Sequence, residues 1–338
     1  MRGIEIGIRL PPCSSVRNIA EAAAEAEELG FDQVWIPDSQ LLWRDPFVTL
    51  AACAVGTTSI QLGTAVTNIV TRHTSVLASA ARTVAELAPG RLTLGVGTGN
   101  SSVQPVGLRA SRQSELQEAF SALRALLGGG EYEFNGVRGK LRDPGPALPI
   151  YLAASGPKNL QLAGRIADGA ILLSGVSPET LTRSAELVKS GADSIGRAAD
   201  SVVLTVSAYC HVTDDLARDS RRLKPICAGI AQHGGSSALS MAGIDVHVPS
   251  RIEGLYPDVI HAEDWDLAVD LCGEWISDED AIKFAQSFCL FGTAEEIAAG
   301  IERVQDAGAS KILLQHVGSY DLPYELMNSF AGAVMPRL

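Results

Sequence analysis

The sequence predicts a (β/α)8 barrel of the TIM-barrel class, formed as a single domain over residues 1–338. Short apolar segments alternate with alanine-rich amphipathic segments along most of the chain, which is typical of a parallel sheet covered by helices. Eight strand-like segments can be counted, and eight favour a closed barrel over an open doubly wound sheet. Several helix-like segments end at a glycine, such as Gly30 and Gly308, which is the usual residue after a helix.

The eight expected strands and the helices between them follow in regular order. The strands are expected at residues 4–10, 33–37, 60–66, 91–96, 148–156, 168–173, 201–210 and 310–316. Helices are expected at residues 16–29, 46–56, 75–87, 111–127, 158–166, 178–189 and 294–307, with Thr74 as the N-cap of the third.

Two segments depart from this alternation. Asn135-Gly136 lies between two short alternating runs, which predicts a β-hairpin. Residues 213–288 are too many for one crossover and carry prolines and acidic residues. They are expected to form an insertion, helical in part, that lies over the barrel mouth near the seventh strand.

Composition and charge exclude several classes of function. The formal net charge of −12 argues against nucleic acid as the main partner. No apolar run is long enough to span a membrane, and the N-terminal sequence does not resemble a signal peptide. The six cysteines and six histidines show no metal-ligand spacing. We expect a cytoplasmic enzyme that acts on a small molecule and has no metal site.

In a barrel of this class the active site lies at the carboxyl ends of the strands. The stretch GVGTGN, residues 95–100, is such an end. It fails the dinucleotide-binding fingerprint because residue 100 is Asn. Two interpretations stay open: the glycines make room for a neighbouring side chain, or the bare backbone at Thr98 and Gly99 accommodates a flat ring.

Two further strand ends are followed by the start of a helix. Thr67 and Asn68 end the third strand, and Arg72 and His73 follow; these two residues either bind an anion or hold the loop. The turn after the fifth strand offers exposed backbone, a hydroxyl and an ammonium group, so it is either a phosphate site or a simple capped helix start. Its residues are Ala154, Ser155, Gly156 and Lys158.

The remaining candidates are polar or aromatic residues at other strand ends. Asp38, Ser39 and Trp43 follow the second strand, where Trp43 either borders a substrate pocket or packs on the barrel. His211 and His316 end the seventh and eighth strands and could relay a proton.

Several stretches together resemble the luciferase-like superfamily of flavin and deazaflavin oxidoreductases, and most closely its coenzyme F-420-dependent branch, which includes methylenetetrahydromethanopterin reductases. The resemblance implies a TIM barrel with the cofactor ring against the third and fourth strand ends and the cofactor phosphate at the SGPK turn. It also implies a homodimer and a non-prolyl cis peptide within residues 63–67. The stretches are GFDQVWIPDS (30–39), LGTAVTNIVTRHTSVLASAARTVAEL (62–87), GRLTLGVGTGN (90–100), LPIYLAASGPKNLQLAGRIADGAIL (148–172) and FGTAEEIAAGIERVQDAGASKILL (291–314).

The resemblance assigns roles to individual residues. It implies that the cofactor is bound by Asp38, Thr67, Asn68, Thr98, Gly99, Ala154, Ser155 and Gly156.

This chain departs from the family pattern at three positions. Sugar-phosphate and alcohol dehydrogenases of the F-420 branch carry histidine where this chain has Ser39, although Trp43 matches their tryptophan. Relatives carry glutamate or aspartate where this chain has Asn100, and the reductases carry glutamate near Arg9. An amide exchanges no proton and a guanidinium stays charged, so the usual acid–base groups are missing or moved.

The leading hypothesis is an F-420-dependent enzyme that moves a hydride to or from an electrophilic carbon or an imine-like centre. Arg9 and Asn100 would orient the substrate, Trp43 would shape its pocket, and Ser39, His211 or His316 would relay a proton. One alternative is an FMN-dependent two-component monooxygenase supplied with reduced flavin by a partner reductase. A further alternative is a non-catalytic protein that binds a flavin-like ligand.

Overall fold

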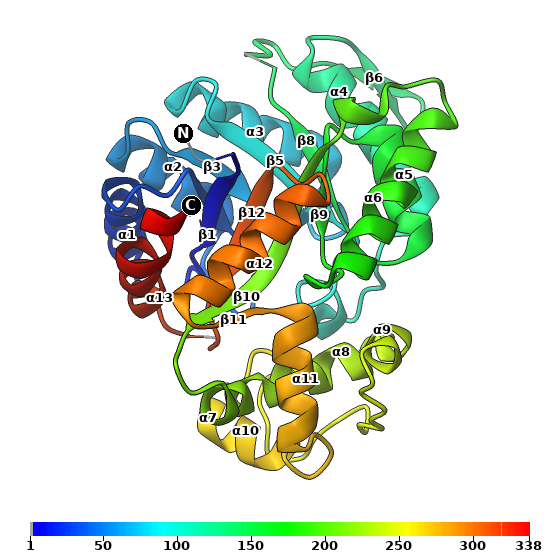
Figure 1. The fold of residues 1–338 in the computed structure, drawn as a ribbon. Helices are drawn as coiled ribbons and strands as arrows, with labels where there is room; N and C mark the ends of the chain where they lie inside the picture. Colours follow the sequence, from blue (N-terminus) through cyan, green and yellow to red (C-terminus); the bar gives the residue numbers. More distant parts are fainter. Residues whose placement is uncertain (1–2, 146, 319) are drawn as a thin grey trace.

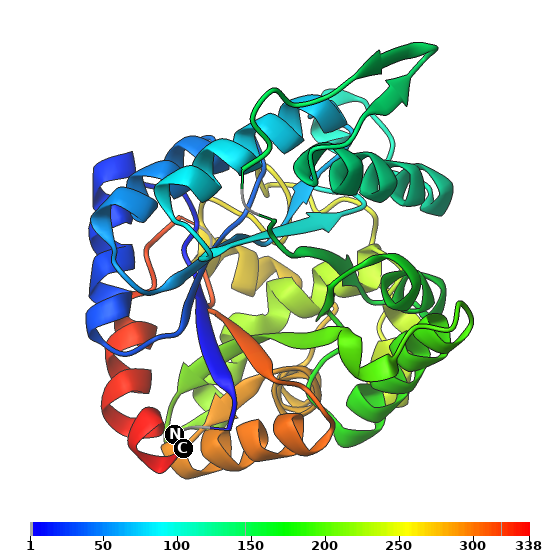
Figure 2. The same ribbon diagram turned by 90° about the horizontal axis from the view of Figure 1, so that it is seen from above.

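Eight parallel strands close into a barrel in the computed structural model, which describes residues 3–145, 147–318 and 320–338 (Figures 1 and 2). Each strand pairs with the next, and the last pairs with the first, so the ring is complete. This confirms the predicted barrel. The strands are β1 (Glu5–Arg9), β2 (Gln33–Ile36), β3 (Gln61–Thr64), β5 (Leu92–Gly97), β8 (Ile150–Ala154), β9 (Gly169–Leu172), β10 (Val203–Val212) and β12 (Lys311–Gln315).

The outer helices follow the predicted order and pack their apolar faces on the strands. In the first helix the buried residues Ile19, Ala22, Ala23 and Ala26 recur at helical spacing. The helices are α1 (Val16–Glu28), α2 (Pro46–Gly56), α3 (Thr74–Leu87), α4 (Gln113–Leu127), α5 (Pro157–Ile166), α6 (Pro178–Asp193) and α12 (Ala294–Asp306).

One predicted helix cap is wrong. The residue at the N-cap of α3 is His73, whose ring Nδ1 accepts a hydrogen bond from the backbone N–H of Ser75 at 3.3 Å. The imidazole therefore supplies the acceptor that a Thr74 hydroxyl was expected to supply, and Thr74 becomes the first helical residue.

The predicted hairpin is present, and some short elements were not predicted. Asn135 and Gly136 both have positive φ, 49° and 82°, as a two-residue turn between antiparallel strands requires. The hairpin strands are β6 (Tyr132–Phe134) and β7 (Val137–Gly139). The unpredicted elements are β4 (Thr67–Asn68), β11 (Leu290–Gly292) and α13 (Tyr324–Ser329).

Residues 213–288 form a helical lobe at the carboxyl end of β10 (Figure 1). The lobe has its own apolar cluster, which includes Cys227, Cys272 and Phe284. Because this cluster is separate from the main core, the lobe packs as a unit beside the barrel mouth. Its helices are α7 (Leu216–Asp219), α8 (Lys224–Gln232), α9 (Ser236–Met241), α10 (Trp265–Cys272) and α11 (Asp278–Phe288).

The barrel interior is filled at its amino end and middle, which leaves only the carboxyl end open. Lys311 and Glu5 pair at 2.8 Å near the amino end. Trp35 fills the middle, and it fits because Gly7 and Gly63 face it: a Cβ would lie 2.9 Å from its ring at Gly7 and 2.5 Å at Gly63. No described helix is long and apolar enough to cross a membrane.

Candidate active site

A cleft of about 260 Å³ lies at the carboxyl ends of the strands, where the barrel class predicts the active site. Most of the candidate residues border it, so the structure brings together residues from five separate loops. The predicted residues that line the cleft are Arg9, Asp38, Ser39, Trp43, Thr67, Asn68, Thr98, Gly99, Asn100, Ala154 and Ser155.

The floor of the cleft is formed by the segment after β3. The peptide bond between Ala65 and Val66 is cis, as the resemblance implied for this segment. A Cβ on Gly95 would lie 2.1 Å from the Thr64 carbonyl oxygen, and one on Gly97 would lie 2.6 Å from a Val66 methyl group. These two glycines therefore make room for the floor.

The third glycine of the GVGTGN stretch has a different position. Gly99 has φ of +82° and lines the cleft, as does its neighbour Thr98. The structure supports the packing interpretation at Gly95 and Gly97. A flat ring at Thr98 and Gly99 stays a prediction.

Asp38 lines the cleft and is buried in an ion pair. Its carboxylate accepts hydrogen bonds from Thr67 Oγ1 at 2.7 Å and from Arg72 Nε at 2.8 Å. Arg72 also donates to Asp45 at 2.7 Å. Burial opposes charge on Arg72, but the hydrogen bonds to Asp38 and Asp45 prevail and raise its pKa. Arg72 therefore holds the loop, which favours the structural interpretation of this residue.

Polar side chains tie the loops around the cleft to one another. Asn68 accepts backbone hydrogen bonds from Val70 and Thr71 and donates to Ser102 Oγ at 3.0 Å. The hydroxyls of Ser39 and Ser101 lie 2.6 Å apart. Asn68 and Ser39 thus fix the wall, whereas Asn100 is exposed at the rim of the cleft.

The cleft continues into a larger groove of about 580 Å³, and Ser155 and Leu173 line both. The groove runs over the start of α5 and between α6 and the lobe helices α8 and α9. Gly156 is the N-cap of α5 and provides no side-chain cap. Pro157 has no N–H and Asn159 donates to the Gly156 carbonyl, so the backbone N–H of Lys158 is the first-turn donor that can face an anion. Lys158 is exposed and lines neither cavity.

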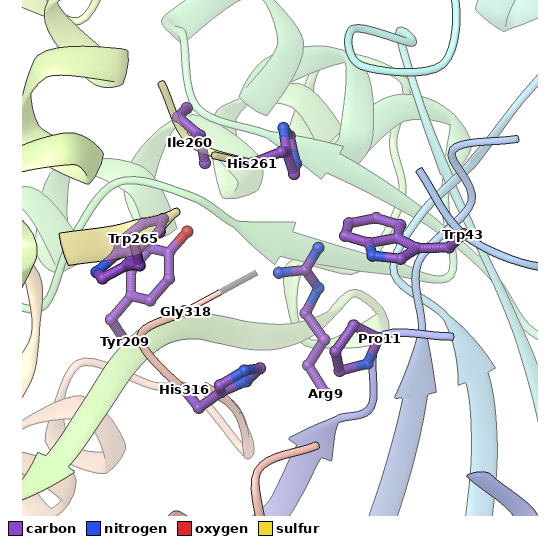
Figure 3. Close-up of a pocket in the computed structure, with 9 residues that line it drawn as sticks. All are labelled: Arg9, Pro11, Trp43, Tyr209, Ile260, His261, Trp265, His316 and Gly318. Carbon is purple, nitrogen blue, oxygen red and sulfur yellow. The ribbon is translucent and has the colours of Figure 1, made fainter. Parts of the chain in front are cut away.

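A small recess opens beside the cleft under the lobe (Figure 3). Arg9 and Trp43 line both the recess and the cleft. The Arg9 guanidinium carbon lies 5.1 Å from the centre of the Trp43 ring, and its Nη1 donates to Gln315 Oε1 at 2.9 Å. The full lining is Arg9, Pro11, Trp43, Tyr209, Ile260, His261, Trp265, His316 and Gly318.

The two candidate histidines have different environments. His316 lines the recess, and its Nε2 lies 3.4 Å from Asp321 Oδ1. His211 lines none of these cavities; its Nε2 lies 3.6 Å from Asp219 Oδ2, and its ring packs against Phe291. Burial, together with the nearby Arg222, lowers the pKa of His211. The structure therefore separates His211 from the other candidates.

Four residues of the site were not predicted from the sequence. Gln315 lies beside Arg9 and Tyr209 because β12 pairs with β1 and β10 in register. Gln315 follows Leu313 by two residues, so strand alternation could have placed it inside the barrel. His261 and Trp265 come from the lobe, where no periodic pattern indicates which residues face the barrel.

Within the described residues, no group of three or more histidine, cysteine or acidic side chains could hold a metal ion. The polar groups that line the cleft and the recess are the Arg9 guanidinium, the paired Asp38 carboxylate, two imidazoles, amides and hydroxyls. This set suits an organic ligand with flat and anionic parts.

The sequence of the chain is similar to the sequences of known enzymes. The chain is 30% identical over 314 residues to 5,10-methylenetetrahydromethanopterin reductase of Methanolobus tindarius, covering 91% of this chain and 92% of the relative. It is 36% identical over 204 residues to the F-420-dependent glucose-6-phosphate dehydrogenase of Nakamurella multipartita, covering 54% of this chain and 60% of the relative.

A solved structure has the same fold over its whole length. The coenzyme F-420-dependent tetrahydromethanopterin reductase of Methanopyrus kandleri superposes with a TM-score of 0.78 at 23% identity, covering 99% of both chains. The model of the luciferase-like monooxygenase family matches residues 4–311, which include every strand of the barrel up to the start of β12. The chain belongs to the luciferase-like monooxygenase family.

Proposed function

We propose that the protein is an oxidoreductase that transfers a hydride between coenzyme F-420 and a small organic substrate. The cleft and the groove carry this proposal, because they share Ser155 and Leu173 and form one path for a long ligand. The names of two relatives, an F-420-dependent dehydrogenase and an F-420-dependent reductase, support the choice of coenzyme.

The residues along this path fit the parts of a deazaflavin coenzyme. The floor at Ala65–Val66 and the bare backbone at Gly99 suit a flat ring. The uncapped start of α5 at Gly156 suits the phosphate of the tail. The apolar groove beyond, bordered by the lobe, suits the remainder of the tail. When bound, the coenzyme supplies the carbon that gives or takes the hydride.

The protein's own groups then bind and orient the substrate and exchange a proton with it. Arg9 and Asn100 border the cleft from different loops and are proposed to orient the substrate over the floor. Trp43 and the lobe residues exclude water from the recess. Among the candidate groups His316 is best placed to exchange a proton, because it lines the recess and Ser39 is engaged with Ser101.

Parallel titrations with F-420 and FMN test this proposal, with the variant Gly156→Asp as the probe of the tail site. Aspartate is a good N-cap and its Cβ would meet nothing within 4 Å, so α5 should remain folded. Its carboxylate would repel the phosphate and compete with it for the Lys158 N–H. We expect F-420 affinity to fall by about tenfold or more.

Gly139→Asp on the exposed hairpin is the matched control, because its Cβ would also meet nothing and F-420 affinity should not change. Tight binding of FMN together with no binding of F-420 would overturn the proposal. It would favour the FMN-dependent monooxygenase that the family description allows, and oxygen consumption with reduced FMN would then identify that activity.

A further inference from the structure

Arg9 places a positive charge at the top of the barrel interior. It is the last residue of β1, and its guanidinium is bonded to the neutral amide of Gln315 and lies against Trp43. Gln315 is itself held by Ser207, to which its Nε2 donates at 2.8 Å. No carboxylate among the described residues forms an ion pair with Arg9.

A guanidinium in this environment favours an anionic partner. Burial lowers the pKa of Arg9, yet an arginine side chain stays protonated in proteins. Taking a charge out of water is costly unless an opposite charge accompanies it. These surroundings therefore indicate that Arg9 binds an anionic group of a ligand.

A second buried donor lies at the same place. Trp43 is 7% exposed, and its indole Nε1 is buried without a hydrogen-bond partner among the described residues. Buried indole N–H groups usually have an acceptor, so this donor also indicates that an acceptor atom of a ligand binds here. Figure 3 shows the indole beside the Arg9 guanidinium, with Pro11 below both.

The other charged groups near the recess are already paired with each other. His261 Nδ1 lies 3.0 Å from Asp258, and His316 Nε2 lies 3.4 Å from Asp321. Both acids are thus engaged, and neither neutralises Arg9. The remaining walls are apolar or aromatic, and they come from Tyr209, Ile260 and Trp265.

The size of the recess limits what can enter it. Its volume is about 10 Å³, which is about the space that one water needs. Because Arg9 and Trp43 also line the cleft, a terminal oxygen-bearing group could enter the recess while the rest of the ligand stays in the cleft. A phosphate group is bulkier and usually takes more donors than these two side chains offer.

We propose that the substrate of this enzyme is a small carboxylate, whose carboxylate group is bound by Arg9 and by the indole N–H of Trp43. The planar guanidinium matches the geometry of a carboxylate. The carboxylate end fixes the position of the neighbouring carbon skeleton above the floor of the cleft. The inference rests on the proposed function for the reaction, but the binding of the anion can be measured without the coenzyme.

The test compares benzoate with its neutral analogue benzamide by calorimetry and tryptophan fluorescence, with inorganic phosphate as a third probe. Benzoate should bind the wild-type protein saturably and at least about tenfold more tightly than benzamide or phosphate. Arg9→Met should weaken benzoate binding by about tenfold or more and abolish the preference over benzamide. Trp43→Phe keeps a ring but removes the donor and should weaken benzoate binding by about fivefold.

Two further variants keep the test decisive. Arg138→Met makes the same substitution on the exposed hairpin and should bind benzoate like the wild type. Arg9→Lys keeps the charge and should bind benzoate with intermediate affinity, which serves if Arg9→Met fails to fold as judged by circular dichroism.

Three results would overturn the inference: equal binding of benzoate and benzamide, tighter binding of phosphate, or no saturable binding at tens of millimolar. Titration with F-420 separates this inference from the proposed function. If F-420 fails to bind while benzoate binding still depends on Arg9, the proposed function falls and the carboxylate site stands. If F-420 binds and benzoate does not, the proposed function stands and the carboxylate site falls.

Discussion

At the scale of single residues, charge pairing distinguishes two charged residues that both line the cleft. Asp38 is paired with Arg72, whereas no acidic side chain among the described residues pairs with Arg9. Both are charged residues at strand ends, and the sequence does not distinguish them, because their difference lies in which loops come together. The sequence therefore predicted the positions of these groups but not their pairing.

The pair formed by Asp38 and Arg72 gives a prediction about stability. The Asp38 side chain is 1% exposed, so Asp38→Asn leaves Arg72 without its buried partner and should lower the free energy of unfolding by about 3 kcal/mol. Asp45 binds the same arginine but its side chain is 41% exposed. Asp45→Asn keeps the N-cap of α2 and should cost less than about 1 kcal/mol.

Urea unfolding followed by circular dichroism measures both variants. Equal losses for Asp38→Asn and Asp45→Asn would show that the buried pair has no special role in holding the floor.

The histidines show a second limit of prediction at this scale. His211 and His316 both lie at the ends of expected strands, so the same role was predicted for both. β10 continues past the barrel to pair with β11, where Phe291 lies beside His211 in register. Because β11 has only three residues, no pattern in the sequence revealed this extension.

At the scale of elements, the pattern of apolar residues predicted the barrel strands and outer helices. Each of these elements buries one face over several residues, and this leaves a periodic apolar pattern in the sequence. The short strands β4 and β11 and the way the lobe packs were not predicted. They depend on contacts between distant segments, such as the recess walls that Ile260 and Trp265 supply from the lobe.

One contact between elements gives a pH-dependent prediction. Glu27, near the end of α1, accepts hydrogen bonds from the backbone N–H groups of Thr58, Ser59 and Ile60 before β3. Burial alone would raise the pKa of Glu27, but these bonds prevail and lower it from 4.5 to about 2. The stability that they add is thus fully present above the unfolded pKa and is lost as the pH falls through about 2.

Glu27→Gln removes the negative charge that these N–H groups stabilise. We expect the free energy of unfolding to fall by about 1–2 kcal/mol near neutral pH. The gap from the wild type should narrow below about pH 4.5 and close near pH 2. Glu28→Gln, at the exposed neighbouring position, should change little. Thermal unfolding over a pH series measures this, and a gap that stays constant with pH would refute the assignment.

At the scale of the whole molecule, the eightfold alternation and the family resemblance predicted the barrel and the cis peptide. The carboxylate substrate that we propose could not be inferred from the sequence, because it depends on a recess formed by β1, β10, β12, the β2 loop and the lobe together. The resemblance implies acidic residues at the positions of Arg9 and Asn100, and this expected difference was the one indication in the sequence that pointed to an unfamiliar substrate.

The central claim is that one continuous path at the barrel mouth binds coenzyme F-420. The most direct measurement is a crystal structure of the protein with F-420 bound. We expect the ring on the Ala65–Val66 floor beside Gly99, the phosphate at the first turn of α5, and the recess beside Arg9 still free for a substrate. A ring bound outside this cleft, or a coenzyme phosphate paired with Arg9, would contradict it.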